Sequence, residues 1–234
     1  MTVIPHIIHA RTLGDAWRQC VDKLIADGDR FNLVVHISEP STINDEQLRQ
    51  YNPRRIDSSV MSIFDVANTI FPKQSGKWEL GIDQFSDYYK DVYDRLKRRS
   101  PPGWGFYFQR LISFGSTRSN QLASIVAGLG DWGRRHHGAF VLHLSSIETD
   151  KPRPQGGPCW QFAEFMADGD KLNLLVTYRS HDYFLKALGN FVGLSRLLTF
   201  VCKKTDHLVG TLTCISTYAY LNKHKTKTER LLAL

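Results

Sequence analysis

Two apolar runs separated by a short turn constrain the fold of this chain more than any other feature. They lie on either side of residues 168–170 in the stretch GGPCWQFAEFMADGDKLNLLVTYRSHDYFLKALGN, which spans residues 156–190. Apolar runs with such a turn between them predict a β-hairpin. A buried helix is predicted to follow at 182–204, because large apolar residues recur there at three- and four-residue steps.

The hairpin brings two chemically useful residues together. If its strands pair, Cys159 and Arg179 lie on neighbouring strands. A guanidinium near a thiol favours the thiolate, which is the nucleophilic form of cysteine. The pattern therefore predicts a nucleophile with an anion site beside it. The alternative interpretation is an inert buried cysteine and a solvated Arg-Ser strand end.

Length and composition indicate a globular protein. The chain has 234 residues, of which 42% are hydrophobic, so it can bury a sizeable core. No linker, repeat or low-complexity tract divides it, and we predict a single α+β domain over residues 1–234. The four cysteines have no spacing typical of a zinc site or a disulfide framework. We therefore expect no metal and a reducing, cytoplasmic setting, and we see neither a signal peptide nor a membrane span.

Hydrophobic periodicity predicts the remaining elements. Helices are expected at 12–26, 59–71, 82–98 and 120–129, and strands at 31–37, 139–144 and 208–216. Residues 38–51 are expected to form a polar loop in which 45–50 can make a helical turn.

The charges favour an anionic ligand. The net charge of +7 would suit a nucleic acid, a phosphorylated metabolite or an acidic surface. In the cluster DWGRRHH, Arg134 and Arg135 stand side by side, and arginine forks match phosphate oxygens. A phosphate is favoured over a metal there, because no carboxylate or cysteine lies at ligand spacing. Asn190 interrupts an apolar helix face, so its amide must bond either a neighbouring loop or a substrate.

The order of these residues resembles the thymidylate synthase family. The shared features are Pro-Cys at 158–159, Arg-Ser-x-Asp at 179–182 and then Asn190, and the likeness continues to Gly210. It is convincing from about Asn120 and thin before that. The resemblance implies a mixed β-sheet packed with helices. It also implies transfer of a one-carbon unit from 5,10-methylenetetrahydrofolate to C5 of a pyrimidine 5′-monophosphate, in a homodimer.

The resemblance also implies roles for single residues. Cys159 matches the nucleophile that adds to C6, and Arg179 and Ser180 match the phosphate-binding pair. Asp182 matches the aspartate that meets the pyrimidine, and Asn190 matches the amide that reads the base edge. Asparagine favours uracil over cytosine at that position.

Further positions match with departures. Arg134 and Arg135 resemble the arginines that one subunit lends to the phosphate of its partner. In the segment YFQRL, Tyr107 matches a catalytic tyrosine, although the following glycine is Phe108. Tyr220 falls on the ribose-binding histidine. Trp160 replaces the histidine that follows the cysteine, and we assign it to cofactor binding.

One departure bears directly on turnover. The glutamate that organises proton transfer in the family aligns with Ile63 or Ser62, neither of which can do its work. Three hypotheses therefore follow. The first is an enzyme that methylates or hydroxymethylates a pyrimidine nucleotide, the second is a nucleotide-binding protein without turnover, and the third, resting only on charge and aromatic content, is a nucleic-acid-binding domain.

Overall fold

One mixed β-sheet organises the chain. The computed structural model describes residues 3–73, 77–99, 105–132, 138–151 and 156–234. The strands follow the order β1-β2-β7-β5-β4-β3 across the sheet, and β6 pairs with the end of β7. They are β1 (His6–Ala10), β2 (Arg30–Ile37), β3 (Phe140–His143), β4 (Trp160–Asp168), β5 (Lys171–Tyr178), β6 (His181–Asp182) and β7 (Leu208–Tyr220).

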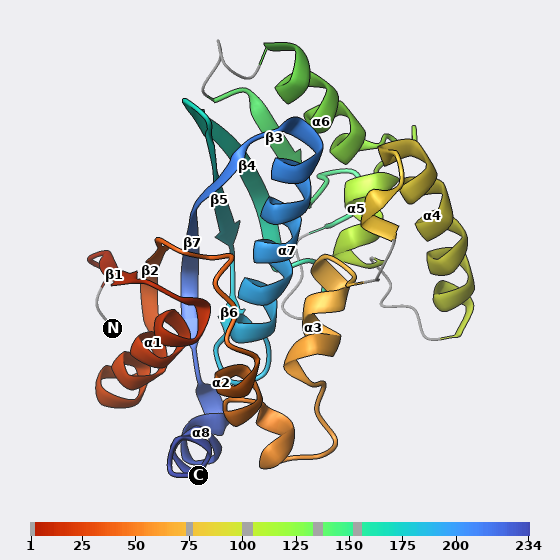
Figure 1. Cartoon of the computed structure of the whole chain (residues 1–234). Helices are drawn as coiled ribbons and strands as arrows, with labels where there is room; N and C mark the ends of the chain where they lie inside the picture. The colour runs from red at the N-terminus through yellow and green to blue at the C-terminus, as the bar shows by residue number, and fades with distance from the viewer. Residues whose placement is uncertain (1–2, 74–76, 100–104, 133–137, 152–155) are drawn as a thin grey trace.

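The helices gather on one face of this sheet (Figure 1). They are α1 (Leu13–Asp27), α2 (Asp45–Gln50), α3 (Ile63–Ile70), α4 (Ile82–Arg99), α5 (Tyr107–Ile112), α6 (Gln121–Trp132), α7 (Ala187–Thr205) and α8 (Lys225–Leu232). Short 3-10 turns lie at Pro53–Arg55, Lys77–Glu79 and Asn222–His224. No described helix is long and apolar enough to cross a membrane.

The predicted hairpin is confirmed. β4 and β5 pair antiparallel through a tight turn at which Asp168 lies opposite Lys171. Gly169 in this turn has a φ of 57°, a left-handed conformation that glycine adopts without a steric penalty. β7 continues the sheet parallel to β5 and antiparallel to β2. The sheet is therefore mixed, as the resemblance implied.

Several predicted boundaries are wrong, and the strands β1 and β6 and the helices α5 and α8 were not predicted. The buried helix begins at Ala187 rather than at Asp182, because the Asp182 carboxylate accepts hydrogen bonds from the backbone N–H groups of Phe184 (3.0 Å) and Leu185 (2.8 Å). A local turn of this kind competes with helix formation. β7 runs on to Tyr220, four residues beyond its predicted end at 216. β1, at the N-terminal edge, was not predicted at all.

A cluster of aromatic rings fixes α4 and α5 to α7. The ring of Phe108 lies edge-on to Phe71 at 5.2 Å and to Phe85 at 5.7 Å, and Phe85 stacks on Phe200 of α7 at 4.7 Å. Edge-on and offset arrangements of this kind are the favoured geometries for aromatic pairs. Phe108, which replaces a family glycine, is therefore a core residue. Its burial fixes the orientation of α5 and of its first residue, Tyr107.

Glycines allow α7 to approach α3 closely. A Cβ added at Gly189 would lie 2.5 Å from the Val66 Cβ, and one added at Gly193 would lie 2.5 Å from the Ile70 Cβ. Carbon atoms cannot approach so closely without displacing one another. The two glycines are one helical turn apart and face two α3 residues with the same spacing. Small residues in α7 therefore set the separation of the two helices.

Substitution of Gly193 by alanine is expected to destabilise the protein. The added methyl group overpacks the contact with α3, and such overpacking lowers the free energy of unfolding by about 1–3 kcal/mol. Gly130 in α6 is the matched control, because it is exposed and nothing lies within 4 Å of a Cβ added there. Gly130→Ala should stabilise by up to about 1 kcal/mol through helix propensity. Urea denaturation measures both values, and an equal effect of the two variants would contradict the packing argument.

Candidate active site

The predicted nucleophile opens onto a cavity of about 320 Å³ between the sheet and α3, α5 and α7. Its wall includes Cys159 and five of the other predicted site residues. These are Tyr107, Ser180, Asp182, Asn190 and Tyr220. The residues come from separate parts of the chain, so the fold rather than the sequence brings them together.

Backbone pairing holds Cys159 beside Arg179, as the hairpin predicted. The Arg179 N–H donates to the Cys159 carbonyl at 2.9 Å. Thr217 of β7 donates its hydroxyl to the Arg179 carbonyl at 2.7 Å, which ties this end of β5 to the centre of the sheet. The nucleophile therefore sits on a strand end that is fixed from two sides.

Tyr107 also fixes the nucleophile. Its hydroxyl oxygen accepts hydrogen bonds from the N–H groups of Cys159 at 2.8 Å and Trp160 at 3.1 Å. Burial raises the pKa of the Tyr107 phenol, so the group stays protonated at neutral pH. Tyr107 can therefore orient the cysteine but is not a phenolate.

Burial outweighs the effect of Arg179 on the thiol. The pKa of Cys159 is raised, first by its withdrawal from water and then by the Asp182 carboxylate, while Arg179 and Lys186 oppose the rise. The predicted effect of Arg179, which is to favour the thiolate, is therefore present but smaller than the effect of burial in the protein without ligand. The guanidinium acts with the predicted sign, but desolvation is the larger effect.

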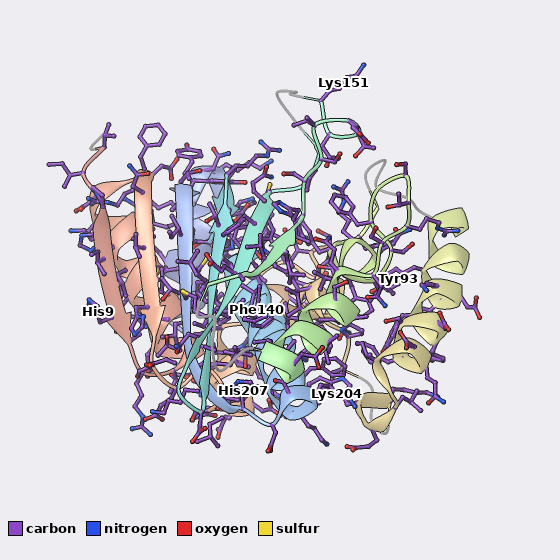
Figure 2. All side chains as sticks on the ribbon, turned by 90° about the horizontal axis from the view of Figure 1, so that it is seen from above. His9, Tyr93, Phe140, Lys151, Lys204 and His207 are labelled. Atoms are coloured by element: carbon purple, nitrogen blue, oxygen red, sulfur yellow. The ribbon has the colours of Figure 1, made fainter. Side chains whose placement is uncertain are left out.

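The Arg179 side chain hydrogen-bonds the backbone that precedes Cys159. Its Nε donates to the Pro158 carbonyl at 3.0 Å and an Nη to the Gly156 carbonyl at 2.9 Å. It lines a second cavity, of about 420 Å³, together with Lys151, and Gly157 borders both cavities. Lys151 stands at the outer end of this region (Figure 2). The structure thus separates Arg179 from Ser180, and the shared phosphate role of the two residues stays a prediction.

Ser180, Asp182 and Tyr220 form one side of the main cavity. β6 pairs with β7 so that Asp182 lies opposite Tyr220. Burial raises the pKa of Tyr220, and the nearby Ser180 side chain opposes the rise. Burial raises the pKa of Asp182, and its backbone hydrogen bonds oppose the rise. These three residues are brought together as the resemblance implied.

Asn190 lies at the buried end of the cavity. Its side-chain nitrogen is 3.0 Å from Nε2 of His181, which is itself completely buried. Burial lowers the pKa of His181 to about 3, so the ring is neutral. The Tyr178 hydroxyl nearby is buried with no hydrogen-bond partner among the described residues. An unpartnered buried hydroxyl indicates that a polar ligand belongs at this end.

Sequence reasoning missed several residues of the cavity wall, and two of them, His181 and Lys186, can carry charge. Both stand inside the stretch RSHDYFLK, but at positions that the resemblance did not assign. The ammonium group of Lys186 lies 3.3 Å from the Met61 sulfur. Withdrawal from water lowers the pKa of Lys186, and the charge of Asp182 opposes this. Polar residues within an otherwise apolar helical pattern were the feature that could have identified them.

Trp160 is not on the described cavity wall. Trp160 is fully buried, and its indole N–H donates to the Phe162 carbonyl at 2.9 Å, so it offers no surface to a cofactor. The assignment of Trp160 to cofactor binding therefore disagrees with its burial. Arg134 and Arg135 lie outside the described residues.

The two positions aligned with the family glutamate have structural roles. Ser62 is the N-cap of α3, and its hydroxyl accepts a hydrogen bond from the Asp65 N–H at 3.1 Å. Ile63 is buried in the core. Asp182 is the single carboxylate on the cavity wall among the described residues. The described residues therefore place no carboxylate at the two positions where the resemblance implies the glutamate.

Comparison with known proteins gives the family. No family model matches the chain. A putative thymidylate synthase of Methanosarcina barkeri is 36% identical over 238 residues, which cover 94% of this chain and 91% of that protein. Proteins of the same description from Methanococcoides burtonii (25% identity, 94% and 91% covered) and Methanocaldococcus jannaschii (26%, 69% and 74%) are also similar.

Fold and site together define an α+β protein with a cysteine-lined cavity at the edge of a mixed sheet. The likeness to the Methanosarcina barkeri protein extends over nearly the whole of both chains. The chain belongs to this thymidylate synthase-like family.

The charges around Cys159 predict how its reactivity depends on pH. Asp182→Asn removes a charge that raises the thiol pKa, whereas Lys186→Met removes one that lowers it. Alkylation by iodoacetamide should therefore move to lower pH in Asp182→Asn and to higher pH in Lys186→Met. Cys159 alone among the four cysteines is not fully buried, so the native protein should be labelled there. Mass spectrometry across pH 6–10 measures the two profiles.

Asp168→Asn is the matched control, since it makes the same change at the exposed far end of β4. Its labelling profile should coincide with that of the unchanged protein. If the labelling profile of Asp182→Asn also coincided with that of the unchanged protein, the inferred electrostatic control of the thiol would be wrong.

Proposed function

We propose that this protein transfers a one-carbon unit from 5,10-methylenetetrahydrofolate to C5 of a pyrimidine 5′-monophosphate, with a dUMP-type substrate favoured. The observation that carries the proposal is the shared cavity. The Cys159 thiol, the Asn190 amide and the Asp182 carboxylate line one space, in a chain that belongs to a thymidylate synthase-like family. The product is either the methylated or the hydroxymethylated nucleotide.

The cavity offers complementary ends for such a substrate. Asn190 lies at its buried end, where an amide can bond the polar edge of a base, and Ser180 and Tyr220 line another part of the wall. We assign the sugar and phosphate to the side of Ser180 and Tyr220. Arg179, at the adjoining cavity, is placed to attract the phosphate. Anchoring away from the reacting carbon can supply roughly 7–11 kcal/mol by orientation.

Nucleophilic addition is the step assigned to Cys159. The thiol loses its proton, the sulfur bonds to C6, and the electron pair of the C5–C6 bond moves toward C5 and O4. C5 then bonds to the methylene carbon, and loss of the C5 proton breaks the bond between that carbon and the folate nitrogen, which leaves an exocyclic methylene group. A hydride from the released tetrahydrofolate gives the methyl product, or a water molecule gives the hydroxymethyl product. In either case the C5–C6 double bond forms again as the C6–S bond breaks and the Cys159 thiolate leaves. Tyr107 holds the nucleophile through the backbone N–H of Cys159 and offers a protonated phenol on the same wall. Lys186 is a second group on that wall that can exchange a proton.

The second substrate supplies the carbon atom, and the cavity has a surface that fits a flat ring. Met61, Val66 and Phe106 form an apolar part of the wall. A neighbouring cavity of about 240 Å³ shares Thr69 and Phe106 with the main one, so the hollow continues along α3 and α4. We assign the methylene donor to this side, where apolar walls also limit the access of water.

A homodimer is part of the proposal. The helices leave the other face of the sheet uncovered (Figure 1). Because side chains alternate along a strand, this face carries half-buried apolar residues that include Val34, Leu175 and Ile215. Val34 and Ile215 pair across β2 and β7, so the apolar surface is continuous between these strands. We propose that a second copy covers this face. The resemblance further implies that Arg134 and Arg135 of each subunit reach the phosphate in the other.

The alternative is a nucleotide-binding protein that has lost turnover. Two observations favour it: structural residues stand where the family has its glutamate, and the Cys159 pKa is raised rather than lowered. This alternative requires the same cavity and the same nucleotide. It predicts tight nucleotide binding that survives Cys159→Ser.

Release of tritium from C5-labelled nucleotide tests the reaction. C5 loses its hydrogen only after the C6 adduct forms, so tritium release reports the reaction. With methylenetetrahydrofolate present, dUMP, as the favoured substrate, should release tritium faster than dCMP, UMP or CMP. Cys159→Ala should abolish release, and omission of the folate should do the same. Cys202→Ala, which changes a buried cysteine in α7, is the matched control and should retain release.

Three outcomes separate the hypotheses. Release that needs both Cys159 and the folate supports the enzyme, and the product mass distinguishes methylation from hydroxymethylation. Nucleotide binding by calorimetry without release supports the protein without turnover. Neither binding nor release would overturn both.

A charge on the uncovered sheet face should separate the proposed dimer. Ile215→Glu would place an unpaired carboxylate in the interface, and burying such a charge costs several kcal/mol. Sedimentation velocity should give twice the 26.8 kDa mass of the chain for the unchanged protein and the single mass for the variant. Ile147→Glu is the matched control, because Ile147 is 98% exposed in a loop. A monomeric unchanged protein would contradict the dimer.

A further inference from the structure

The cavity ends in a chain of buried polar groups that reaches away from the ligand space. Asn190 contacts Nε2 of His181 at 3.0 Å, and Nδ1 of the same ring contacts the Ser216 hydroxyl at 2.9 Å. Ser216 in turn contacts the Tyr183 hydroxyl at 3.1 Å. Each group is at least nine-tenths buried, so every hydrogen bond here is made without competition from water.

We propose that His181 locks the Asn190 amide in one orientation and thereby makes the site select uracil over cytosine. This inference rests on the proposed function, since it concerns how the same cavity reads its base. His181 is a positioning residue in this arrangement, because it acts on the ligand through Asn190.

The direction of the hydrogen bonds follows from the Asn190 end of the chain. The Asn190 side-chain nitrogen, 3.0 Å from Nε2 of His181, can only donate, so Nε2 is the acceptor. The neutral ring then carries its proton on Nδ1, and Nδ1–H donates to the Ser216 hydroxyl. The Ser216 hydroxyl keeps its own proton for a further acceptor, and the Tyr183 hydroxyl lies 3.1 Å away.

Packing keeps the imidazole ring from turning. The ring stacks on Tyr178 with centroids 4.1 Å apart and planes 5° from parallel. Phe191 meets the same ring edge-on at 5.9 Å. A ring held on its face and at its edge cannot exchange its two nitrogens by rotation. The tautomer is therefore set by Ser216 and the orientation by the aromatic neighbours.

A fixed amide distinguishes the two pyrimidines. Uracil presents a donor at N3 and an acceptor at C4, whereas cytosine reverses both. A free amide can flip and satisfy either base. In the locked orientation, one NH₂ proton of Asn190 is bound to His181. The carbonyl oxygen and the second NH₂ proton can then pair with the donor and acceptor arrangement of only one of the two bases. The other base would leave buried groups unpaired, which is the most effective means of discrimination at a polar site.

Removal of Ser216 should weaken the selection without removing Asn190. In Ser216→Ala, Nδ1 loses its acceptor, the other tautomer becomes accessible, and the amide can flip. We expect the ratio of dUMP to dCMP affinities, measured by calorimetry, to fall by about tenfold, which corresponds to one unpaired buried hydrogen-bonding group. Tyr183→Phe should lower the ratio in the same direction and by less. Ser195→Ala is the matched control, because that buried serine of α7 bonds the Pro40 carbonyl, away from the cavity.

A second measurement determines directly which ring nitrogen of His181 carries the proton, and it needs no ligand. Nitrogen-15 NMR of the histidine side chains, with the His181 resonance assigned from a His181→Gln variant, should show the proton on Nδ1. The same resonance in Ser216→Ala should show loss of this preference.

The outcomes are distinct for the two proposals. An unchanged affinity ratio in Ser216→Ala, an equal change in Ser195→Ala, a preference of the unchanged protein for dCMP, or a proton on Nε2 would overturn the lock while leaving the nucleotide site intact. Failure of the unchanged protein to bind either nucleotide would overturn the proposed function itself. A lower ratio in Ser216→Ala with the proton on Nδ1 in the unchanged protein would support the lock.

Discussion

The parallel pairing of β5 and β6 with β7 is the constraint on which the candidate site depends. It places Tyr178 opposite Ser216 and Asp182 opposite Tyr220. The chain leaves β5, makes one turn and rejoins the same neighbour strand, so residues 178–182 all stay against β7. Without this pairing, the residues after Arg179 would form an ordinary loop. With it, they form the rigid floor of a cavity.

Desolvation governs the electrostatics of that cavity. It raises the pKa of Cys159 and of Asp182, and it lowers the pKa of His181 and of Lys186. In each case the charged form is disfavoured. A bound phosphate and base would therefore change the field that the thiol experiences. Under the proposed function, this arrangement would leave the nucleophile inert until the substrate is in place.

The fold was largely predictable where periodicity was strong. The hairpin, the helix at 82–98 and the strand at 31–37 follow from apolar spacing that tertiary contacts did not override. The start of α7 did not follow, because Asp182 ties the next turn to itself and the apolar pattern continues through that turn. The strand at 6–10 is short and lies at the sheet edge. The alternation of apolar and polar residues is a weak signal for a strand there.

The sequence by itself determined the order of Cys159, Ser180, Asp182 and Asn190, and that order resembled one family before any fold was known. Only the tertiary structure decided what surrounds them. Residue spacing cannot report that Trp160 is covered or that Arg179 lines another cavity. Nor can it report that His181 and Ser216, far apart in the chain, share a hydrogen bond. Burial and hydrogen-bond partners depend on segments distant in sequence, and those two quantities set the charge and orientation of every group in the site.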